Sequence, residues 1–432
     1  MIDKNVFCVG LGKLGLIFSF ILAEKGFKIY GTDIDEQIEW KIKNNIKDKE
    51  PKLNDLIKKN KKKFKFIKDY KYAMQETNSC FIILPTPSKK NNEYDNSYIF
   101  NCLDKIGKNL KNKKKYLINI TSTVNPNSCR SFIEFLEKKF NLKHGKEFIL
   151  TYNPHLIALG SIYNDVFNSD LVILGSDLKE GHNILINFYK KLYSKNLKKL
   201  RKLNLAEAEV SKIAINSYIT MKISFSNLIS SISDKENNLD SSVILNTIGF
   251  DKRIGHKYLS LGAMFAGPCF PRDNLNFAKF LKNKKIDNSL PKVIDKINDL
   301  QFNRYINIYK KNKKVFKYNP KIGICGLSYK DNTPLTTKSP GEKLLNYFKN
   351  TNKVFIYDDF IDKINLKNVE QTKNINDLFS KSDIIFICYK YKKFQMLNKL
   401  YSNKNKLIID LWNYLKVSKK RNNLKIIKLG IS

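Results

Sequence analysis

The first part of the chain alternates short apolar runs with longer segments that mix polar and apolar residues. Segments such as Leu16–Lys25 have a helical pattern. The apolar runs predict strands at Asn5–Val9, Lys28–Gly31, Cys80–Leu84, Tyr116–Ile120, Phe148–Thr151 and Leu171–Gly175. Strands that alternate with helices in this way predict a mostly parallel, doubly wound sheet.

From about Leu205 to Ser233 the pattern changes. This stretch has no Gly or Pro, and its apolar or small residues recur at helical spacing, so it predicts one long helix followed by further helices. A loop rich in Gly and Pro is expected at Gly262–Asp273.

A second alternating pattern begins near Lys321, with a helix expected at Gly341–Phe348. It predicts strands at Ile322–Cys325, Val354–Tyr357, Ile384–Cys388 and Leu407–Asp410. We therefore predict an α/β protein in which two Rossmann-like doubly wound domains are joined by a long central helix and a helical middle domain. The expected domains are residues 1–200, 201–305 and 315–432.

The turn after the first strand has the sequence Gly-Leu-Gly-Lys-Leu-Gly at residues 10–15, and the second strand ends near Asp33. In such a turn Gly10 permits the tight bend, Gly12 lets the backbone approach a pyrophosphate, and Gly15 allows close packing of helix and strand. The helix N-terminus favours phosphates. A carboxylate at Asp33 can accept hydrogen bonds from a ribose diol, which favours NAD over NADP. Thr86 follows another strand and is expected at the same edge of the sheet.

The 432 residues include 79 Lys and Arg against 40 Asp and Glu, a formal net charge of +39. Hydrophobic residues make up 42%, which is enough for packed cores and excludes a disordered basic tail. Only six of the cations are Arg, the residue best suited to bases and phosphates, and the Lys residues are spread over the chain. We expect no nucleic-acid partner, and we interpret the stretches Lys41–Lys63, Lys111–Lys115 and Lys390–Lys406 as solvated helix faces and loops.

The seven cysteines are odd in number and contain no CxxC pair. They indicate neither a disulfide framework nor a metal site, so we expect a reducing, cytoplasmic location. The apolar stretch Val6–Ala23 contains three glycines and Lys13, which is unlike a signal peptide or a membrane span. We expect a soluble protein with no membrane insertion.

Cys269 lies in the Gly- and Pro-containing loop beside Arg272 and Asp273. A nearby cation favours the thiolate, which is the nucleophilic form. A single cysteine is more often a small buried hydrophobic residue, so both interpretations stay open at this point. Lys212 and Asn216 are four residues apart on the long helix and share a face, where Lys212 either donates to an oxyanion or extends past apolar neighbours to solvent.

Taken together, these segments resemble the UDP-glucose/GDP-mannose dehydrogenase family of nucleotide-sugar 6-dehydrogenases, nearly from end to end. The resemblance is carried by Val9–Gly15 with Asp33, Pro85-Thr86-Pro87, Ser122-Thr123-Val124, Asn153-Pro154 with Gly160, Glu209–Asn216, Arg253-Ile254-Gly255, Cys269–Asp273 and Gly326–Lys330. It implies that the C6 alcohol of a nucleotide sugar is oxidised to a carboxylate by two hydride transfers to NAD, through a thiohemiacetal and a thioester on Cys269. It also implies a homodimer built around the long helix.

The resemblance implies a role for each matching residue. The catalytic residues would be Cys269, Lys212, Asn216, Asp273 and Thr123, with His155 at the place of a family Glu. The cofactor-binding residues would be Gly10, Leu11, Gly12, Lys13, Leu14, Gly15, Asp33, Thr86, Thr123 and Arg272. The residues contacting a UDP- or GDP-sugar would be Lys212, Asn216, Arg253, Tyr258, Phe265 and Lys330. No metal is implied.

The chain departs from the family pattern at several positions. His155 and Leu159 replace two Glu residues, and Ala266 and Met264 replace two glycines of the loop before Cys269. After Lys330, an acidic pair and an Arg are replaced by Pro334, Leu335 and Thr337. A histidine can act as a base near neutral pH, so His155 is expected to slow, but not to abolish, thioester hydrolysis.

Other functions stay open beside oxidation of UDP-glucose. The same chemistry could act on UDP-N-acetylmannosamine, UDP-N-acetylglucosamine or GDP-mannose. The departures also allow a weakened nucleotide-sugar binding protein. A one-step hydroxyacid dehydrogenase would share the glycine turn and the helical middle, but it would not need Cys269.

Overall fold

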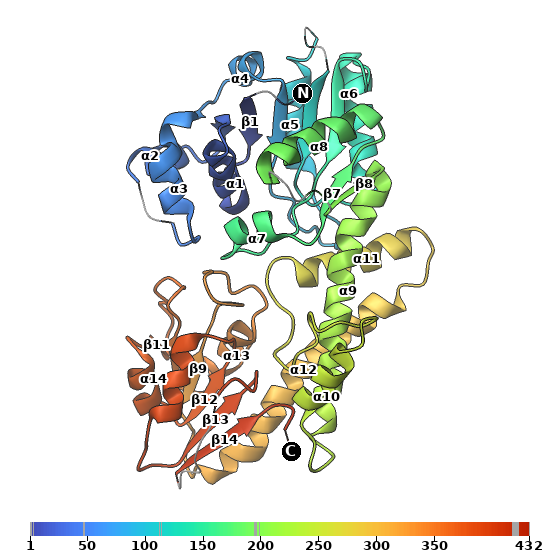
Figure 1. Ribbon diagram of the computed structural model, residues 1–432. Coiled ribbons are helices and arrows are strands. Elements are labelled where there is room, and N and C mark those ends of the chain that lie inside the picture. The colour runs from blue at the N-terminus through green and yellow to red at the C-terminus, as the bar shows by residue number, and fades with distance from the viewer. Residues whose placement is uncertain are drawn as a thin grey trace. The chain divides into compact units, whose positions relative to one another are not determined.

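The computed structural model describes the chain except residues 1, 3, 46, 47, 112, 114, 194–196, 198, 417–422 and 432. It divides into two compact units, Met1–Ala214 and Ile215–Ser432 (Figure 1). Among the described helices, none is both long enough and apolar enough to cross a membrane.

The first unit is built on an eight-stranded sheet in the order β3-β2-β1-β4-β5-β6-β7-β8. Neighbouring strands are parallel, except for the antiparallel pair β6 and β7. The strands are β1 (Asn5–Val9), β2 (Lys28–Thr32), β3 (Phe64–Phe66), β4 (Ser79–Ile82), β5 (Tyr116–Ile120), β6 (Phe148–Tyr152), β7 (Val172–Gly175) and β8 (Leu200–Leu203). The order reverses between β1 and β4, where doubly wound sheets bind their ligands.

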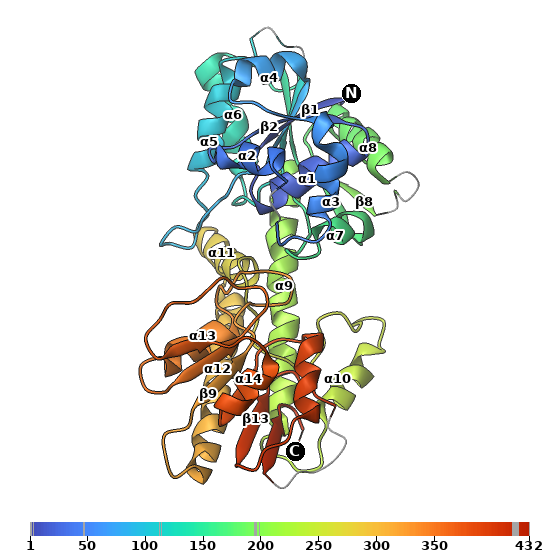
Figure 2. The same ribbon diagram turned by 90° about the vertical axis from the view of Figure 1, so that its left-hand side faces the viewer.

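Helices cover both faces of this sheet (Figures 1 and 2). They are α1 (Lys13–Glu24), α2 (Gln37–Lys43), α3 (Leu53–Asn60), α4 (Tyr70–Glu76), α5 (Ser97–Gly107), α6 (Ser128–Phe140), α7 (Ile162–Asn168) and α8 (Lys179–Tyr193), with a 3-10 turn at Lys61–Lys63. One apolar core joins α1, α3, α7 and α8 on one face of the sheet, and α4, α5 and α6 cover the other. Because both faces are covered, the central strands are buried along their whole length.

The long helix α9 (Leu205–Ile232) is followed by α10 (Ser241–Gly249), α11 (Phe270–Asn283) and α12 (Ser289–Asn312), with a 3-10 turn at Lys313–Val315. Polar side chains join α9 to α11 and α12 in the second unit. Ser217 donates to Asn274 of α11 at 2.9 Å, and Arg304 of α12 forms two bonds with Asp234, just beyond α9. Because these hydrogen bonds join particular side chains, they fix how each helix is rotated about its own axis as well as its distance from α9.

The second unit also contains a six-stranded parallel sheet in the order β11-β10-β9-β12-β13-β14. Its strands are β9 (Ile322–Cys325), β10 (Val354–Tyr357), β11 (Val369–Gln371), β12 (Ile384–Ile387), β13 (Lys406–Asp410) and β14 (Leu424–Lys428). Its helices are α13 (Pro340–Phe348), α14 (Ile375–Lys381) and a 3-10 helix at Lys392–Lys399. Helices α12 and α13 cover one face, and α14 with the 3-10 helix covers the other.

The predicted fold class is confirmed, since both sheets follow the doubly wound order on either side of a helical region. The division into three domains at residues 1–200, 201–305 and 315–432 stays a prediction. One prediction about the surface is wrong. Lys406, at the end of a stretch assigned to solvent, is 8% exposed and lies in β13. Its ammonium group donates to the carbonyls of Phe379 and Ser382, which are buried with it.

Candidate active site

The glycine turn between β1 and α1 is shaped by close backbone contacts. Gly10 has a φ of +92°, and a Cβ atom there would press on the carbonyl of Ile83 next to β4. A Cβ on Gly15 would collide with the carbonyl oxygen of Gly10. Only glycine fits these two positions, and together they let the chain pass from strand to helix at the edge where the strand order reverses.

The same turn is open where a ligand would approach. A Cβ on Gly12 would meet nothing within 4 Å, and Gly12 and Lys13 are exposed at the start of α1. Asp33 accepts hydrogen bonds from the backbone N–H of Leu11 at 2.5 Å and of Asp35 at 3.0 Å, and its carboxylate is only partly buried. Free amides at a helix N-terminus and an accessible carboxylate fit a pyrophosphate and a ribose diol, so these residues fit NAD.

Two further loops meet at the carboxyl ends of β4 and β5. The hydroxyl of Thr86 donates to the carbonyl of Thr123 at 2.7 Å, and Ser122 donates to the carbonyl of Leu84 at 2.7 Å. The structure therefore brings Thr86 and Thr123 together at the end of β4, which neighbours β1, the strand that leads into the glycine turn. Leu14, also predicted to contact the cofactor, is partly buried and packs against the core of the unit.

Cys269 differs from the other six cysteines. It is exposed, whereas Cys8, Cys80, Cys102, Cys129, Cys325 and Cys388 are buried. Burial raises the pKa of the Cys8 and Cys102 thiols to about 12, so they stay protonated and unreactive. Cys269 instead lies at the N-cap of the 14-residue helix α11, where the helix dipole favours a thiolate.

One turn into α11, Asp273 is fully buried and joins two other predicted residues. Asn216 of α9 donates its side-chain N–H to one oxygen of Asp273 at 2.6 Å, and Arg272 donates to the other at 3.2 Å. The backbone N–H of Asp273 donates to the carbonyl of Cys269 at 2.8 Å. The carboxylate, the amide and the thiol-bearing residue are thus held in a single network within the second unit.

Lys212 lies one turn before Asn216 on α9 and is 5% exposed. Close by, Glu209 is also buried and accepts hydrogen bonds from the backbone N–H groups of Asn127 at 2.6 Å and Cys129 at 2.7 Å. Burial raises the pKa of Glu209. In the sequence, Glu209 stands out only as the first residue of the motif Glu209–Asn216. The structure shows that it holds the start of α6, a few residues after Thr123, against the same helix that carries Lys212.

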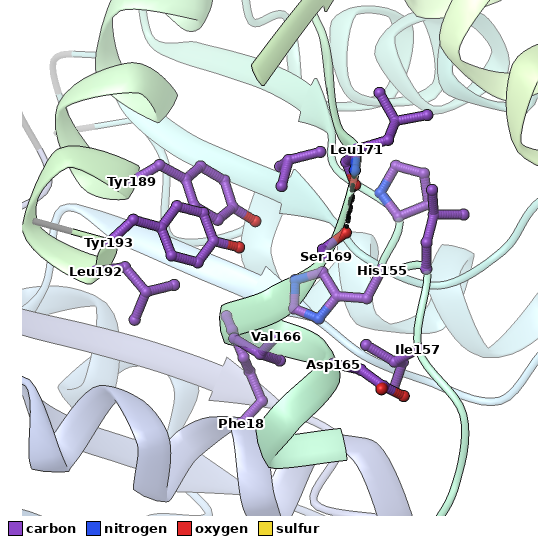
Figure 3. A pocket seen from close by; sticks show the side chains of 13 residues that line it. Phe18, His155, Ile157, Asp165, Val166, Ser169, Leu171, Tyr189, Leu192 and Tyr193 are labelled. Carbon is purple, nitrogen blue, oxygen red and sulfur yellow. Dashed lines mark hydrogen bonds between the residues drawn. The ribbon is translucent and has the colours of Figure 1, made fainter. Parts of the chain in front are cut away.

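His155 lies in the first unit with its ring turned into an apolar cavity of about 20 Å³ (Figure 3). The ring meets Phe18 edge to face at 4.6 Å, and Val166 and Ser169 also line the cavity. The residue is partly exposed as a whole, but both ring nitrogens are buried and make no hydrogen bond within the described structure. Burial lowers the pKa of His155 to about 4. Its role as a base stays a prediction, and this placement of the ring speaks against it.

The loop that begins at His155 is held by an acid that the sequence analysis did not single out. The buried carboxylate of Glu50 accepts the backbone N–H groups of Gly160 at 2.7 Å and Ile162 at 3.0 Å, and the second bond caps α7. Leu159 packs against the apolar core of the unit. Glu50 lies more than a hundred residues away from this loop in sequence, so no local sequence pattern predicts its hydrogen bonds to Gly160 and Ile162.

The remaining residues predicted to contact substrate lie in the second unit. Arg253 is exposed and pairs with Asp251 at 2.6 Å. Tyr258 is 46% exposed and has a φ of +64°. Phe265 is buried, and Lys330 is partly buried with its ammonium over the ring of Tyr329. In the loop before Cys269, Ala266 is partly buried and Met264 is buried.

An open glycine turn at the point where the strand order of a doubly wound sheet reverses is a feature of NAD-dependent dehydrogenases. The chain belongs to the UDP-glucose/GDP-mannose dehydrogenase family. Its NAD-binding domain model matches residues 4–193, its central domain model residues 206–300 and its UDP-binding domain model residues 323–417. The predicted resemblance is confirmed, and the protein is an NAD-dependent oxidoreductase of the nucleotide-sugar dehydrogenases.

Individual relatives agree with this assignment. A UDP-glucose 6-dehydrogenase of Rickettsia bellii is 31% identical over 431 residues, covering 95% of this chain and 96% of the relative. A UDP-glucose dehydrogenase from Pyrobaculum islandicum has the same fold, with a TM-score of 0.84 at 21% identity over 99% of this chain and 97% of that chain. A UDP-D-ManNAc dehydrogenase from Pyrococcus horikoshii has a TM-score of 0.85 at 20% identity over 99% of both chains.

Proposed function

We propose that the protein oxidises UDP-glucose to UDP-glucuronate. The single observation that carries the chemistry is the exposed Cys269 at the start of α11, next to the buried pair of Asp273 and Asn216. The choice of sugar rests on the relative named UDP-glucose 6-dehydrogenase, which is similar over nearly the whole chain. NAD held by the glycine turn and Asp33 would supply the hydride acceptor for both oxidations.

Cys269 keeps the carbon under oxidation covalently attached. Its thiolate adds to the C6 aldehyde to give a thiohemiacetal, and loss of the second hydride from C6 gives a thioester. One water then adds to the thioester, the sulfur leaves, and the carboxylate is released. A free aldehyde would escape between the two oxidations, and the covalent bond prevents that loss.

The neighbouring polar groups stabilise the charges that form at C6. In this proposal Lys212 and Asn216 donate to the oxyanions of the two tetrahedral intermediates, a role in which fixed donors give large rate effects. Asp273 fixes the Asn216 amide and accepts a proton from the attacking water. Thr123 orients that water beside the cofactor.

Other residues are proposed to bind the sugar nucleotide and the cofactor. Lys330 neutralises the diphosphate, Arg253 and Tyr258 reach the sugar nucleotide, and Phe265 lies beside the sugar or base. Arg272, which already pairs with Asp273, contacts NAD. The seven cysteines form no disulfide within the described chain, which suits a reducing compartment, so we propose a cytoplasmic location.

The test is a panel of sugar nucleotides with NAD, scored as NADH formed per sugar consumed. We expect two NADH per UDP-glucose and little turnover of UDP-N-acetylmannosamine, UDP-N-acetylglucosamine or GDP-mannose. A preference for one of those sugars would overturn the substrate. One NADH per sugar, or full turnover by Cys269→Ser, would overturn the covalent route. Cys129→Ser is the matched control, because Cys129 is a buried thiol outside the network.

We also propose that the protein is a homodimer joined through α9. Four large apolar side chains are exposed on one face of this helix: Tyr218, Phe225, Leu228 and Ile232. Light scattering should give twice the mass of one chain. Phe225→Glu should give a monomer, whereas Tyr401→Glu, an exposed position on the C-terminal sheet domain, should leave the dimer intact. A monomeric wild type would contradict the proposal.

A further inference from the structure

The segment Leu261–Phe265, which leads to the nucleophile, is buried although it forms neither helix nor strand. Buried backbone N–H and C=O groups need partners, and a segment without regular structure cannot supply them by itself. The groups that bond to this segment therefore show what holds the chain before Cys269 in place.

Three side chains of α12 supply these partners. Asn298 accepts the backbone N–H of Phe265 at 2.8 Å and donates to the carbonyl of the same residue at 3.0 Å. Tyr305 accepts the backbone N–H of Met264 at 2.8 Å. Gln301 donates to the carbonyl of Gly262 at 3.2 Å.

The three side chains form one continuous row along a single face of α12. Asn298, Gln301 and Tyr305 are spaced i, i+3 and i+7, so they share one face of α12, and all three are at most 5% exposed. Of the three, only Asn298 forms hydrogen bonds in the described structure with both the backbone N–H and the backbone C=O of one residue, Phe265. A neighbouring strand in a sheet satisfies a residue in the same way.

The helix that holds the segment is bonded to the helix that carries Asn216, and the segment itself continues to Cys269. Helix α12 is tied to α9, the helix of Asn216, through Arg304 and Ser230. After Phe265, the backbone N–H of Gly267 donates to the carbonyl of Thr337 at 2.9 Å, and Cys269 follows two residues later. A shift of the Phe265 peptide would displace the chain four residues before Cys269, whereas Asn216 and Asp273 are also held by their own hydrogen bond.

We propose that Asn298 is a positioning residue, whose two-point grip on Phe265 sets the place of the Cys269 thiol relative to Asn216 and Asp273. The inference rests on the proposed cysteine chemistry. Reacting groups must be held within a fraction of an ångström, and a displacement of about 1 Å costs on the order of 100-fold in rate.

The experiment compares Asn298→Ala with Asn352→Ala. Asn352 is an equally buried asparagine in the same unit that donates to the carbonyl of Pro320 at 2.8 Å, on the C-terminal sheet domain. Both variants lose side-chain bonds to a backbone carbonyl, so both should lower the melting temperature. Only Asn298→Ala should lower kcat, by about 10- to 100-fold, and this loss should exceed any rise in KM for the sugar nucleotide, which Phe265 is proposed to contact.

Alkylation of Cys269 by iodoacetamide gives a second measurement that needs no turnover, because the other six thiols are buried. We expect Asn298→Ala to change the alkylation rate at least about threefold and Asn352→Ala to leave it unchanged. Equal alkylation rates in wild type and Asn298→Ala, or equal losses of kcat in the two variants, would overturn the proposal. If the wild type reduces no NAD with any sugar nucleotide, the proposed function fails and alkylation still decides the positioning role.

A third variant, Asn298→Asp, tests whether the hydrogen bond donated to the Phe265 carbonyl is needed. The carboxylate keeps an acceptor for the N–H of Phe265 but loses the donor to its carbonyl. Protonation restores that donor, so kcat of the variant relative to wild type should rise as pH falls. A flat ratio would contradict the two-point grip, since a loss of packing alone does not depend on the charge of this side chain.

Discussion

The two doubly wound sheets share a strand order and a turn, yet only one turn is open. In the first sheet Gly10 and Gly15 make the passage from β1 to α1. In the second sheet Gly326 and Gly341 do the same between β9 and α13, and a Cβ on Gly341 would collide with the carbonyl oxygen of Gly326, as Gly15 would with Gly10. The backbone solution is the same in both sheets.

The side chains around the two turns differ. A Cβ on Gly326 would strike the ring of Tyr389, a buried side chain that follows β12, and Ser339 caps the N-terminus of α13. Asp358, the counterpart of Asp33, is 5% exposed and accepts the backbone N–H groups of Leu327 and Ser328, both at 2.8 Å. The second turn thus bonds two of its backbone amides to the buried Asp358, whereas the first presents Gly12 and the partly exposed Asp33 outward. Topology alone does not make a dinucleotide site.

The largest difference between the two turns is expected when a methyl group is added at the paired glycines, Gly15 and Gly341. Gly15→Ala and Gly341→Ala should each destabilise the protein by about 3 kcal/mol, because each Cβ collides with a backbone carbonyl. Only Gly15→Ala should also weaken NAD binding, by about 100-fold or more. Thermal unfolding and NAD titration measure both effects. Equal loss of NAD affinity in the two variants would show that the turns are not functionally distinct.

Acid should reveal a second difference, because the buried imidazole of His155 belongs to the first unit. Burial lowers the pKa of His155 from the ordinary 6.5 to about 4. Between pH 6.5 and pH 4 the imidazole is therefore protonated in the unfolded chain and neutral in the folded protein. The free energy of unfolding should therefore be unaffected above pH 6.5 and fall by up to about 3 kcal/mol as pH drops to 4. Denaturant unfolding across this range should show a smaller fall in His155→Leu, although His144, whose pKa burial also lowers, keeps part of it.

The same variant tests the catalytic role predicted for His155. With its ring buried, His155→Leu should change kcat at pH 7 less than about threefold. A loss of about 100-fold, the usual contribution of a general base, would mean that the ring leaves its cavity during turnover.

The two acids offer a third contrast. Asp358→Asn should lower the free energy of unfolding by about 2 kcal/mol, because a charged acceptor of two buried amides is lost, and NAD affinity should not change. Asp33→Asn should weaken NAD binding about 10-fold with little loss of stability. The reverse pattern, seen by titration and by denaturant unfolding, would assign the dinucleotide to the second turn.

The smallest effect is expected at Gly12. A Cβ there meets nothing within 4 Å, so Gly12→Ala should leave the melting temperature unchanged. The added methyl group should still weaken NAD binding about 10-fold, since it faces the side from which a pyrophosphate approaches. Unchanged NAD affinity would place the cofactor elsewhere.

Most of the strands could be predicted from sequence, and those that could not have something in common. Strands β3, β8, β11 and β14 were not predicted, and they are the four edges of the two sheets. Central strands are buried on both faces and therefore appear as apolar runs, whereas an edge strand such as β8, with the sequence Leu-Arg-Lys-Leu, is half exposed and short. The same reasoning explains Lys406, whose burial depends on carbonyls of α14 and the residue after it and not on its neighbours in sequence.

The site divides in the same way. The glycine turn with Asp33, the long helix with Lys212 and Asn216, and the distinctive thiol of Cys269 could be found in the sequence, because each depends on residues close together in the chain. The cavity around the His155 ring, the bonds of Glu50 to the loop after it, and the bonds of Asn298 to Phe265 became visible only in the folded protein. These contacts join segments that are far apart in sequence. Tertiary packing determines these contacts. The pattern of polar and apolar residues along the chain does not indicate which distant side chain will bond to a buried backbone amide.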